Sequence, residues 1–244
     1  MGYIIFKWRN DNFNGLYVIC DLPLCLIMNN KIAILIGATG ATGSELLIQL
    51  LNDPYFSSVV VLSRRAIDLA NPKLQVHIVD FDNTTSWSHL VKGDVLFSTL
   101  GTTLKVAKTK ANQFKIDYTY QYQVAKAASD NGVNTYVLVS SYGANENSAF
   151  FYPKTKGKLD ADVQKLSFKQ IHIFRPGILQ RQPSKLRPVE KISILIINAL
   201  NKLGLLMKQK PMPVGLLAEK MILVAKKQDA VKTQIHNLNT IFSI

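Results

Sequence analysis

KIAILIGATGATGSELLIQL, residues 31–50, places three glycines at intervals of three between an apolar run and an amphipathic one. The run at 32–36 has the length and the β-branched content of a buried strand, and a helix-period pattern begins directly after the glycines. Gly37 permits a tight turn, Gly40 lets another group approach the backbone, and Gly43 lets the helix pack on the strand. This order of strand, turn and helix predicts a dinucleotide-binding site with the pyrophosphate at the helix N-terminus. The alternative is a tight strand-to-helix turn that binds no ligand.

Short apolar runs alternate with helix-period segments along the rest of the chain. The predicted strands are 32–36, 59–62, 76–79, 95–100, 136–140 and 171–174, and the predicted helices are one ending at 52–54, then 114–129, 156–166, 189–206 and 214–226. Uncharged strands of this kind are typical of a parallel sheet covered by helices on both faces. We therefore expect an α/β fold with a doubly wound parallel sheet, Rossmann-like, in one domain spanning 31–244. A small C-terminal helical substrate portion is expected at about 178–213, and 1–30 is an extension to which the sequence assigns no role.

The end of the second predicted strand bears on the identity of the bound dinucleotide. An NAD site usually has a carboxylate about 20 residues after the glycines, where it holds the ribose 2′-hydroxyl. This chain has Ser63-Arg64-Arg65 instead, with no carboxylate before Asp68. Guanidinium groups bind a 2′-phosphate well, so the pattern favours NADP(H) over NAD(H). The alternative is that both arginines are ordinary surface residues at a strand end.

A second group of polar residues follows the fifth predicted strand. Ser140 and Ser141 end that strand, and Tyr152 and Lys156 follow with a spacing of four, which puts them on one helix face. A tyrosine has an unperturbed pKa of about 10, and a neighbouring ammonium stabilises its phenolate. A serine hydroxyl beside them could hold a carbonyl oxygen, so this set predicts acid–base chemistry on a carbonyl group.

The motifs GATGATG, SRR, DFD, LGTT, VSSYGA, YPKTK and FRPG, in this order, resemble the short-chain dehydrogenase/reductase superfamily in its extended or atypical branch. Within that branch the chain is most similar to the Tat-interacting-protein-like NADP(H)-binding oxidoreductases. The resemblance covers about 31–228. One departure is Asp117, which stands where many members of the superfamily have asparagine, and it puts a proton relay of the family type in doubt.

The resemblance implies a role for each matching position. Ser141 would orient the substrate, with Ser140 as the alternative, Tyr152 would be the acid–base residue and Lys156 would bind the ribose. The implied cofactor-binding residues are Gly37, Thr39, Gly40, Ala41, Thr42, Gly43, Arg64, Arg65, Asp80, Phe81, Leu100, Gly101, Thr102, Lys156 and Pro176.

Two functions of different classes fit these motifs. The first is an NAD(P)-binding oxidoreductase that uses NADPH to reduce a carbonyl substrate at the Ser-Tyr-Lys site. The alternative is a regulator or scaffold that binds NADPH with little turnover. The sequence names no substrate.

The amino-acid composition favours some classes of ligand and partner over others. The net charge is +13, and 151–244 carries almost all of it, with 17 Lys+Arg against 5 Asp+Glu. This favours an anionic carbonyl substrate and leaves weak contact with a membrane surface open, whereas no motif predicts nucleic-acid binding. The two cysteines and four isolated histidines predict no metal site. We expect a cytoplasmic monomer or homodimer.

Overall fold

The computed structural model describes residues 30–180, 211–227 and 230–244. Within them, seven strands form one parallel sheet in the order β3-β2-β1-β4-β5-β6-β9. The strands are β1 (Lys31–Ile36), β2 (Phe56–Ser63), β3 (Leu74–Ile78), β4 (Val95–Ser98), β5 (Thr135–Val139), β6 (Gln170–Arg175) and β9 (Thr233–Asn237). The predicted doubly wound, Rossmann-like sheet is confirmed.

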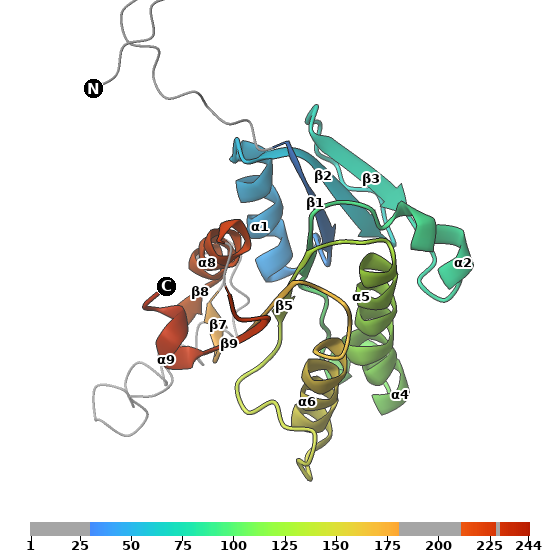
Figure 1. Cartoon of the computed structure of the whole chain (residues 1–244). Coiled ribbons are helices and arrows are strands. Elements are labelled where there is room, and N and C mark those ends of the chain that lie inside the picture. The colour runs from blue at the N-terminus through green and yellow to red at the C-terminus, as the bar shows by residue number, and fades with distance from the viewer. Residues whose placement is uncertain (1–29, 181–210, 228–229) are drawn as a thin grey trace, which may run out of the picture.

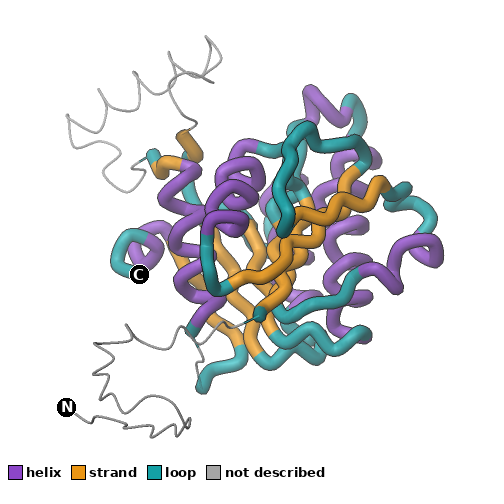
Figure 2. The backbone as a smooth tube through the Cα atoms, turned by 90° about the horizontal axis from the view of Figure 1, so that it is seen from above, coloured by secondary structure: helices purple, strands orange, loops and turns teal. Residues whose placement is uncertain are grey.

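Helices cover both faces of this sheet (Figures 1 and 2). One face carries α1 (Ala41–Asn52) and α8 (Val214–Lys226), and the other carries α5 (Tyr120–Asp130) and α6 (Phe151–Val163). Successive side chains of a strand point to opposite faces of the sheet, so each strand contributes to both cores. In β1, Leu35 belongs to the core of the α1 face and Ile36 to that of the α5 face.

Shorter elements connect these layers. They are α2 (Thr84–Trp87), the 3₁₀ turn η1 (Ser88–Leu90), α3 (Leu104–Ala107), α4 (Lys110–Phe114), the π-helical turn η2 (Lys115–Thr119) and α9 (Leu238–Ile241). A separate two-stranded sheet pairs β7 (Leu179–Gln180) with β8 (Met212–Pro213).

Two predicted helices differ from the observed ones, and one strand of the sheet was not predicted. The helix predicted at 114–129 is interrupted by η2, and the helix predicted at 156–166 begins earlier, at Phe151, because Pro153 is tolerated in the first turn of a helix. Strand β9 was not predicted, because its residues are mostly polar and its Ile235 is 37% exposed. The helix predicted at 189–206, the extension 1–30 except Asn30, and most of the substrate portion at 178–213 lie outside the described residues.

Candidate functional site

The predicted site residues gather at the carboxyl edge of the parallel sheet. The glycine turn follows β1, the two arginines follow β2, Asp80 follows β3, the 100–102 loop follows β4, both serines follow β5 and Pro176 follows β6. The strand order reverses between β1 and β4, with β2 and β3 on one side and β5, β6 and β9 on the other. In open α/β sheets, ligands bind in the crevice at such a switch point.

The glycine turn packs too tightly for side chains. Gly37 has φ +86°, and a Cβ there would lie 2.7 Å from the Leu100 backbone nitrogen. A Cβ on Gly43 would lie 2.1 Å from the Gly37 carbonyl oxygen, so the helix start rests directly on the end of β1. The Thr99 amide and hydroxyl both donate to the Ile36 carbonyl, at 3.0 and 2.9 Å, and this holds β4 against the turn.

The start of α1 is suited to an anion. Gly40 is the N-cap of this 12-residue helix, and no side chain caps it. Backbone N–H groups at such an end have no partner within the helix, and the helix dipole adds positive potential there. Both features fit a dinucleotide pyrophosphate.

The arginines after β2 are accessible. Arg64 and Arg65 are exposed, and within the described part of the chain neither guanidinium makes an ion pair. Asp80 is also exposed, whereas Phe81 is 2% exposed and packs between Trp87 and Tyr120. Phe81 can therefore reach a nucleotide only through its backbone.

The two serines after β5 face different surroundings. Ser140 is 5% exposed, and its amide donates to the Phe174 carbonyl at 2.7 Å. Ser141 is partly exposed, and its hydroxyl donates to the Tyr142 carbonyl at 3.2 Å. Only Ser141 is open to a ligand at the surface.

Helix α6 carries Tyr152 and Lys156 one turn apart. Tyr152 is 39% exposed, whereas Lys156 is 2% exposed. Gly157 follows, and a Cβ there would lie 2.2 Å from the Asn145 carbonyl carbon and from the Glu146 nitrogen. Because this close contact joins α6 to the loop after β5, it fixes the tyrosine and the lysine relative to Ser141.

Asp117 lies on η2, and its side chain is completely buried. One carboxylate oxygen accepts the Thr102 amide at 2.8 Å, and the other has no hydrogen-bond partner among the described residues. Burial raises the pKa of Asp117, and the nearby charge of Lys156 opposes this shift. Contacts thus run from the glycine turn through the loop after β4 to Asp117, which is near enough to Lys156 to be influenced by its charge.

Asp160 is a second buried carboxylate near this lysine, one turn further along α6. It accepts a hydrogen bond from Arg175 Nε at 2.9 Å. Burial raises the pKa of Asp160, while the Ser140 hydroxyl and the charges of Arg175 and Lys156 oppose the shift. The Ser140 hydroxyl lies near the carboxylate without completing a hydrogen bond to it.

Sequence reasoning missed the parts played by Gly157 and Asp160. The spacing Tyr152, Lys156, Asp160 was a usable signal, because residues four apart share a helix face. Gly157 gave no local signal, since the backbone it touches is more than ten residues away in the sequence.

In the described residues no group of three or more His, Cys, Asp or Glu side chains could hold a metal ion. No helix in the same residues is long and apolar enough to cross a bilayer.

Comparison with known proteins identifies the family. Residues 37–192 match the model of an NAD(P)H-binding family. The chain is 41% identical over 150 residues to Protein FMP52, mitochondrial, of Candida albicans, covering 59% of this chain and 66% of that protein. It is 37% identical over 163 residues to Protein fmp52, mitochondrial, of Aspergillus fumigatus, covering 64% of this chain and 70% of that protein.

Solved structures share the fold at low sequence identity. A UDP-glucose 4-epimerase from Thermotoga maritima, solved with UDP-glucose, superposes with a TM-score of 0.62 at 13% identity, covering 85% of this chain and 76% of that one. The Bordetella bronchiseptica enzyme WbmG, solved with NAD, gives a TM-score of 0.64 at 15% identity, covering 88% and 74%.

These relatives also correct one prediction. The expectation of a cytoplasmic protein is wrong, because the similar fungal proteins are named as mitochondrial. Composition could not have indicated this. The chain belongs to the NAD(P)H-binding family and is a relative of the FMP52 proteins.

Proposed function

We propose that this protein is an NADPH-dependent oxidoreductase that reduces a carbonyl substrate at Ser141, Tyr152 and Lys156. The observation that carries the proposal is the docking of α6, through Gly157, on the loop that holds Ser141, with Lys156 buried next to it. The finer likeness to Tat-interacting-protein-like oxidoreductases, and a mitochondrial location like that in the relatives' names, belong to the same proposal.

The glycine turn and the arginines have binding roles in this proposal. The N–H groups at the start of α1 hold the pyrophosphate, and Gly37 and Gly43 keep side chains out of its way. Arg64 and Arg65 hold the 2′-phosphate through charge-assisted hydrogen bonds. NAD in the WbmG complex shows that this fold accommodates a nicotinamide dinucleotide.

The chemical step divides between the cofactor and the chain. Bound NADPH supplies the hydride. Ser141 orients the carbonyl oxygen, Tyr152 donates the proton to that oxygen, and the ammonium of Lys156 stabilises the phenolate that remains. The carboxyl groups of Asp117 and Asp160 lie close enough to Lys156 for its charge to oppose the rise in their pKa values that burial causes. A substrate with an anionic group is proposed from the +12 balance of 151–244.

The test compares the protein with the variant Tyr152→Phe. NADPH oxidation is followed with a panel of neutral and anionic aldehydes and ketones, and NADPH binding is measured separately. The variant should bind NADPH as the wild type does and lose about 100-fold or more in kcat, because proton transfer contributes that much. Wild-type turnover in the variant would contradict the acid–base role. NADPH binding without turnover on any substrate would favour the regulator instead.

A further inference from the structure

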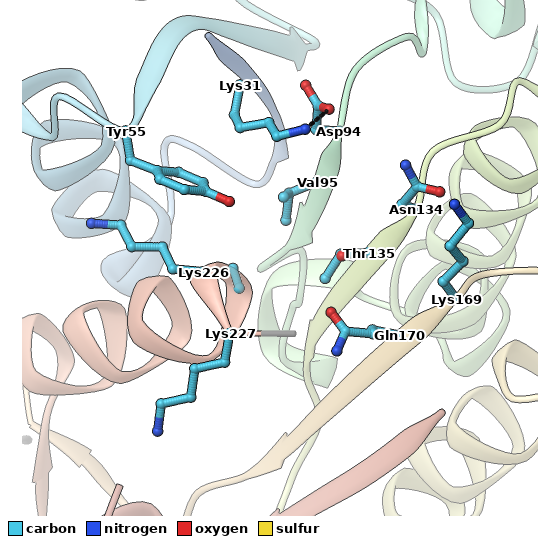
Figure 3. Close-up of a pocket in the computed structure, with 11 residues that line it drawn as sticks. Lys31, Tyr55, Asp94, Val95, Asn134, Thr135, Lys169, Gln170, Lys226 and Lys227 are labelled. Atoms are coloured by element: carbon cyan, nitrogen blue, oxygen red, sulfur yellow. Dashed lines mark hydrogen bonds and ion pairs between the residues drawn. The ribbon is translucent and has the colours of Figure 1, made fainter. Parts of the chain in front are cut away.

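A pocket of about 320 Å³ opens at the amino edge of the sheet, opposite the edge with the glycine turn. It lies among the first residues of β1, β4, β5 and β6 and the end of α8 (Figure 3). The six residues of β1 separate the two edges by roughly 20 Å. Its volume is at the lower end of the roughly 300–1,000 Å³ typical of small-molecule sites. The oxidoreductase proposal makes no use of it.

Positive charge dominates the wall of this pocket. Four lysines line it, with Asp94 as the only carboxylate among the lining residues; the lysines are Lys31, Lys169, Lys226 and Lys227. Lys31 pairs with Asp94 at 2.8 Å, and the other Asp94 oxygen accepts the Ile32 amide at 2.8 Å. Both oxygens of this carboxylate are therefore occupied by groups of the protein.

Two of the lysines that line the pocket have no counter-charge among the described residues. Lys226 pairs with Asp53, whose backbone carbonyl also accepts a hydrogen bond from Lys73. Lys169 and Lys227 are exposed and have no ion-pair partner in the part of the chain that the structure describes. Among the described residues, the pocket therefore has two ammonium groups more than it has paired carboxylates.

Neutral polar groups stand next to this charge. Tyr55, Asn134 and Thr135 line the pocket, and the Tyr55 hydroxyl points toward its middle (Figure 3). The Lys169 ammonium lies beside Asn134, whereas the Lys227 ammonium points away from the Tyr55 hydroxyl and must turn inward to reach a ligand (Figure 3). Such a set matches a compact anion with several oxygens, because a lysine ammonium is a point charge on a flexible stem.

We propose that this pocket binds a phosphate-bearing anion, with Lys169 and Lys227 supplying the charge and Tyr55 and Asn134 supplying hydrogen bonds. A soluble phosphate ester and the headgroup of an anionic lipid share this chemistry. The site is separate from the nucleotide site, so both can be filled at once.

The experiment uses pyrophosphate as the soluble probe and the full chain saturated with NADPH, so that the glycine turn is already occupied. The thermal midpoint is measured against pyrophosphate concentration at constant ionic strength, since a ligand of the native state raises it. A second arm measures co-sedimentation with phosphatidylcholine vesicles with and without phosphatidic acid. The variants are Lys169→Gln with Lys227→Gln, and, as a control with the same charge change, Lys92→Gln with Lys105→Gln, which lie outside the pocket.

The expected result is binding to one probe that weakens about tenfold or more in the pocket variant and is unchanged in the control, because two charge-assisted contacts are lost. A response to pyrophosphate identifies a soluble ligand, and a response to phosphatidic acid vesicles alone identifies a lipid headgroup. Failure of both probes to bind, or equal weakening in both variants, overturns the proposal. NADPH binding is measured in each variant, so a failed cofactor site is distinguished from a failed pocket.

Discussion

Helices α1 and α6 each pack against a loop at a glycine, but the two regions contribute different groups to the candidate site. In α1, Gly43 lies against the Gly37 carbonyl, and the turn between them is only a few residues long. In α6, Gly157 lies against Asn145 and Glu146, within the longer loop between β5 and α6. Both contacts are too close for a Cβ.

The two helices differ in the groups that their first turns make available to a ligand. No side chain caps α1, so this region presents its backbone. The first two turns of α6 carry Tyr152 and Lys156, so that region presents side chains. A backbone site is damaged by added atoms, whereas a side-chain site is damaged by removed ones.

The largest effect is expected from Gly43→Ala. The new methyl group would lie 2.1 Å from the Gly37 carbonyl oxygen, so the turn must open. We expect the free energy of unfolding to fall by about 3 kcal/mol and NADPH affinity to fall about 100-fold, the equivalent of that energy. Urea denaturation and fluorescence titration measure the two quantities.

Gly132→Ala is the control for this variant, because it is the same substitution at a glycine that touches nothing. Gly132 has a positive φ of +82°, unlike the helical Gly43, and a Cβ there meets nothing within 4 Å. It should cost about 1 kcal/mol of stability from the backbone conformation alone and leave NADPH affinity unchanged. Similar losses of affinity in both variants would mean that the tight contact at Gly43 is not what matters.

Gly157→Ala should affect the other region. Its methyl group would displace α6 from the loop that carries Ser141. A displacement of about 1 Å is enough to lower kcat about 100-fold, while NADPH affinity, which depends mainly on the glycine turn, should change less than kcat. If this variant weakened NADPH binding as much as Gly43→Ala does, the division between the two regions would be refuted.

A smaller effect is expected from the arginines that follow β2, which we propose to add side-chain contacts to the cofactor bound at the glycine turn. Arg64→Gln with Arg65→Gln removes two exposed guanidinium groups. The preference for NADPH over NADH should fall about tenfold, because charge-assisted hydrogen bonds to the 2′-phosphate are lost. Dissociation constants for both cofactors test this, and NADH affinity serves as the internal control. An unchanged ratio would show that the arginines are ordinary surface residues.

The smallest effect concerns Asp117, between the two regions. Burial is the main cause of its raised pKa. Above the pKa of Asp117 in the unfolded chain, the native protein therefore retains a proton that the unfolded chain releases. The free energy of unfolding falls as pH rises from the unfolded-state pKa of Asp117 through its folded-state pKa. An asparagine side chain does not titrate in this range. The free energy of unfolding of Asp117→Asn, relative to that of the wild type, should therefore increase from pH 4.5 to pH 7. Urea denaturation at both pH values measures the difference, and a constant difference would contradict the prediction.

The sequence predicted the sheet because its strands have strong local patterns. β1, β2 and β5 are apolar runs, and the glycines between β1 and α1 have one spacing with one structural meaning. The predicted end of the first helix at 52–54 agrees with α1, which ends at Asn52, and α8 has the predicted bounds. Local patterns also indicated that most of the predicted cofactor-binding residues follow the ends of strands.

The parts that the sequence could not predict depend on distant partners. β9 is a strand because it pairs with β6 at the edge of the sheet, and its own residues alternate weakly. The π-turn η2 has no sequence signature, and it puts Asp117 within reach of the Thr102 amide 15 residues away. The mitochondrial name of the relatives came from comparison alone.

Because Lys156 is buried, chemical labelling of its amine can measure the opening of α6. Acylating reagents modify exposed lysines quickly, and this amine, at 2% exposure, can react only when α6 separates from its surroundings. Its rate of modification, followed by mass spectrometry, would therefore report how often α6 separates from its surroundings in the intact protein. Exposed lysines such as Lys105 would give the unprotected rate in the same sample.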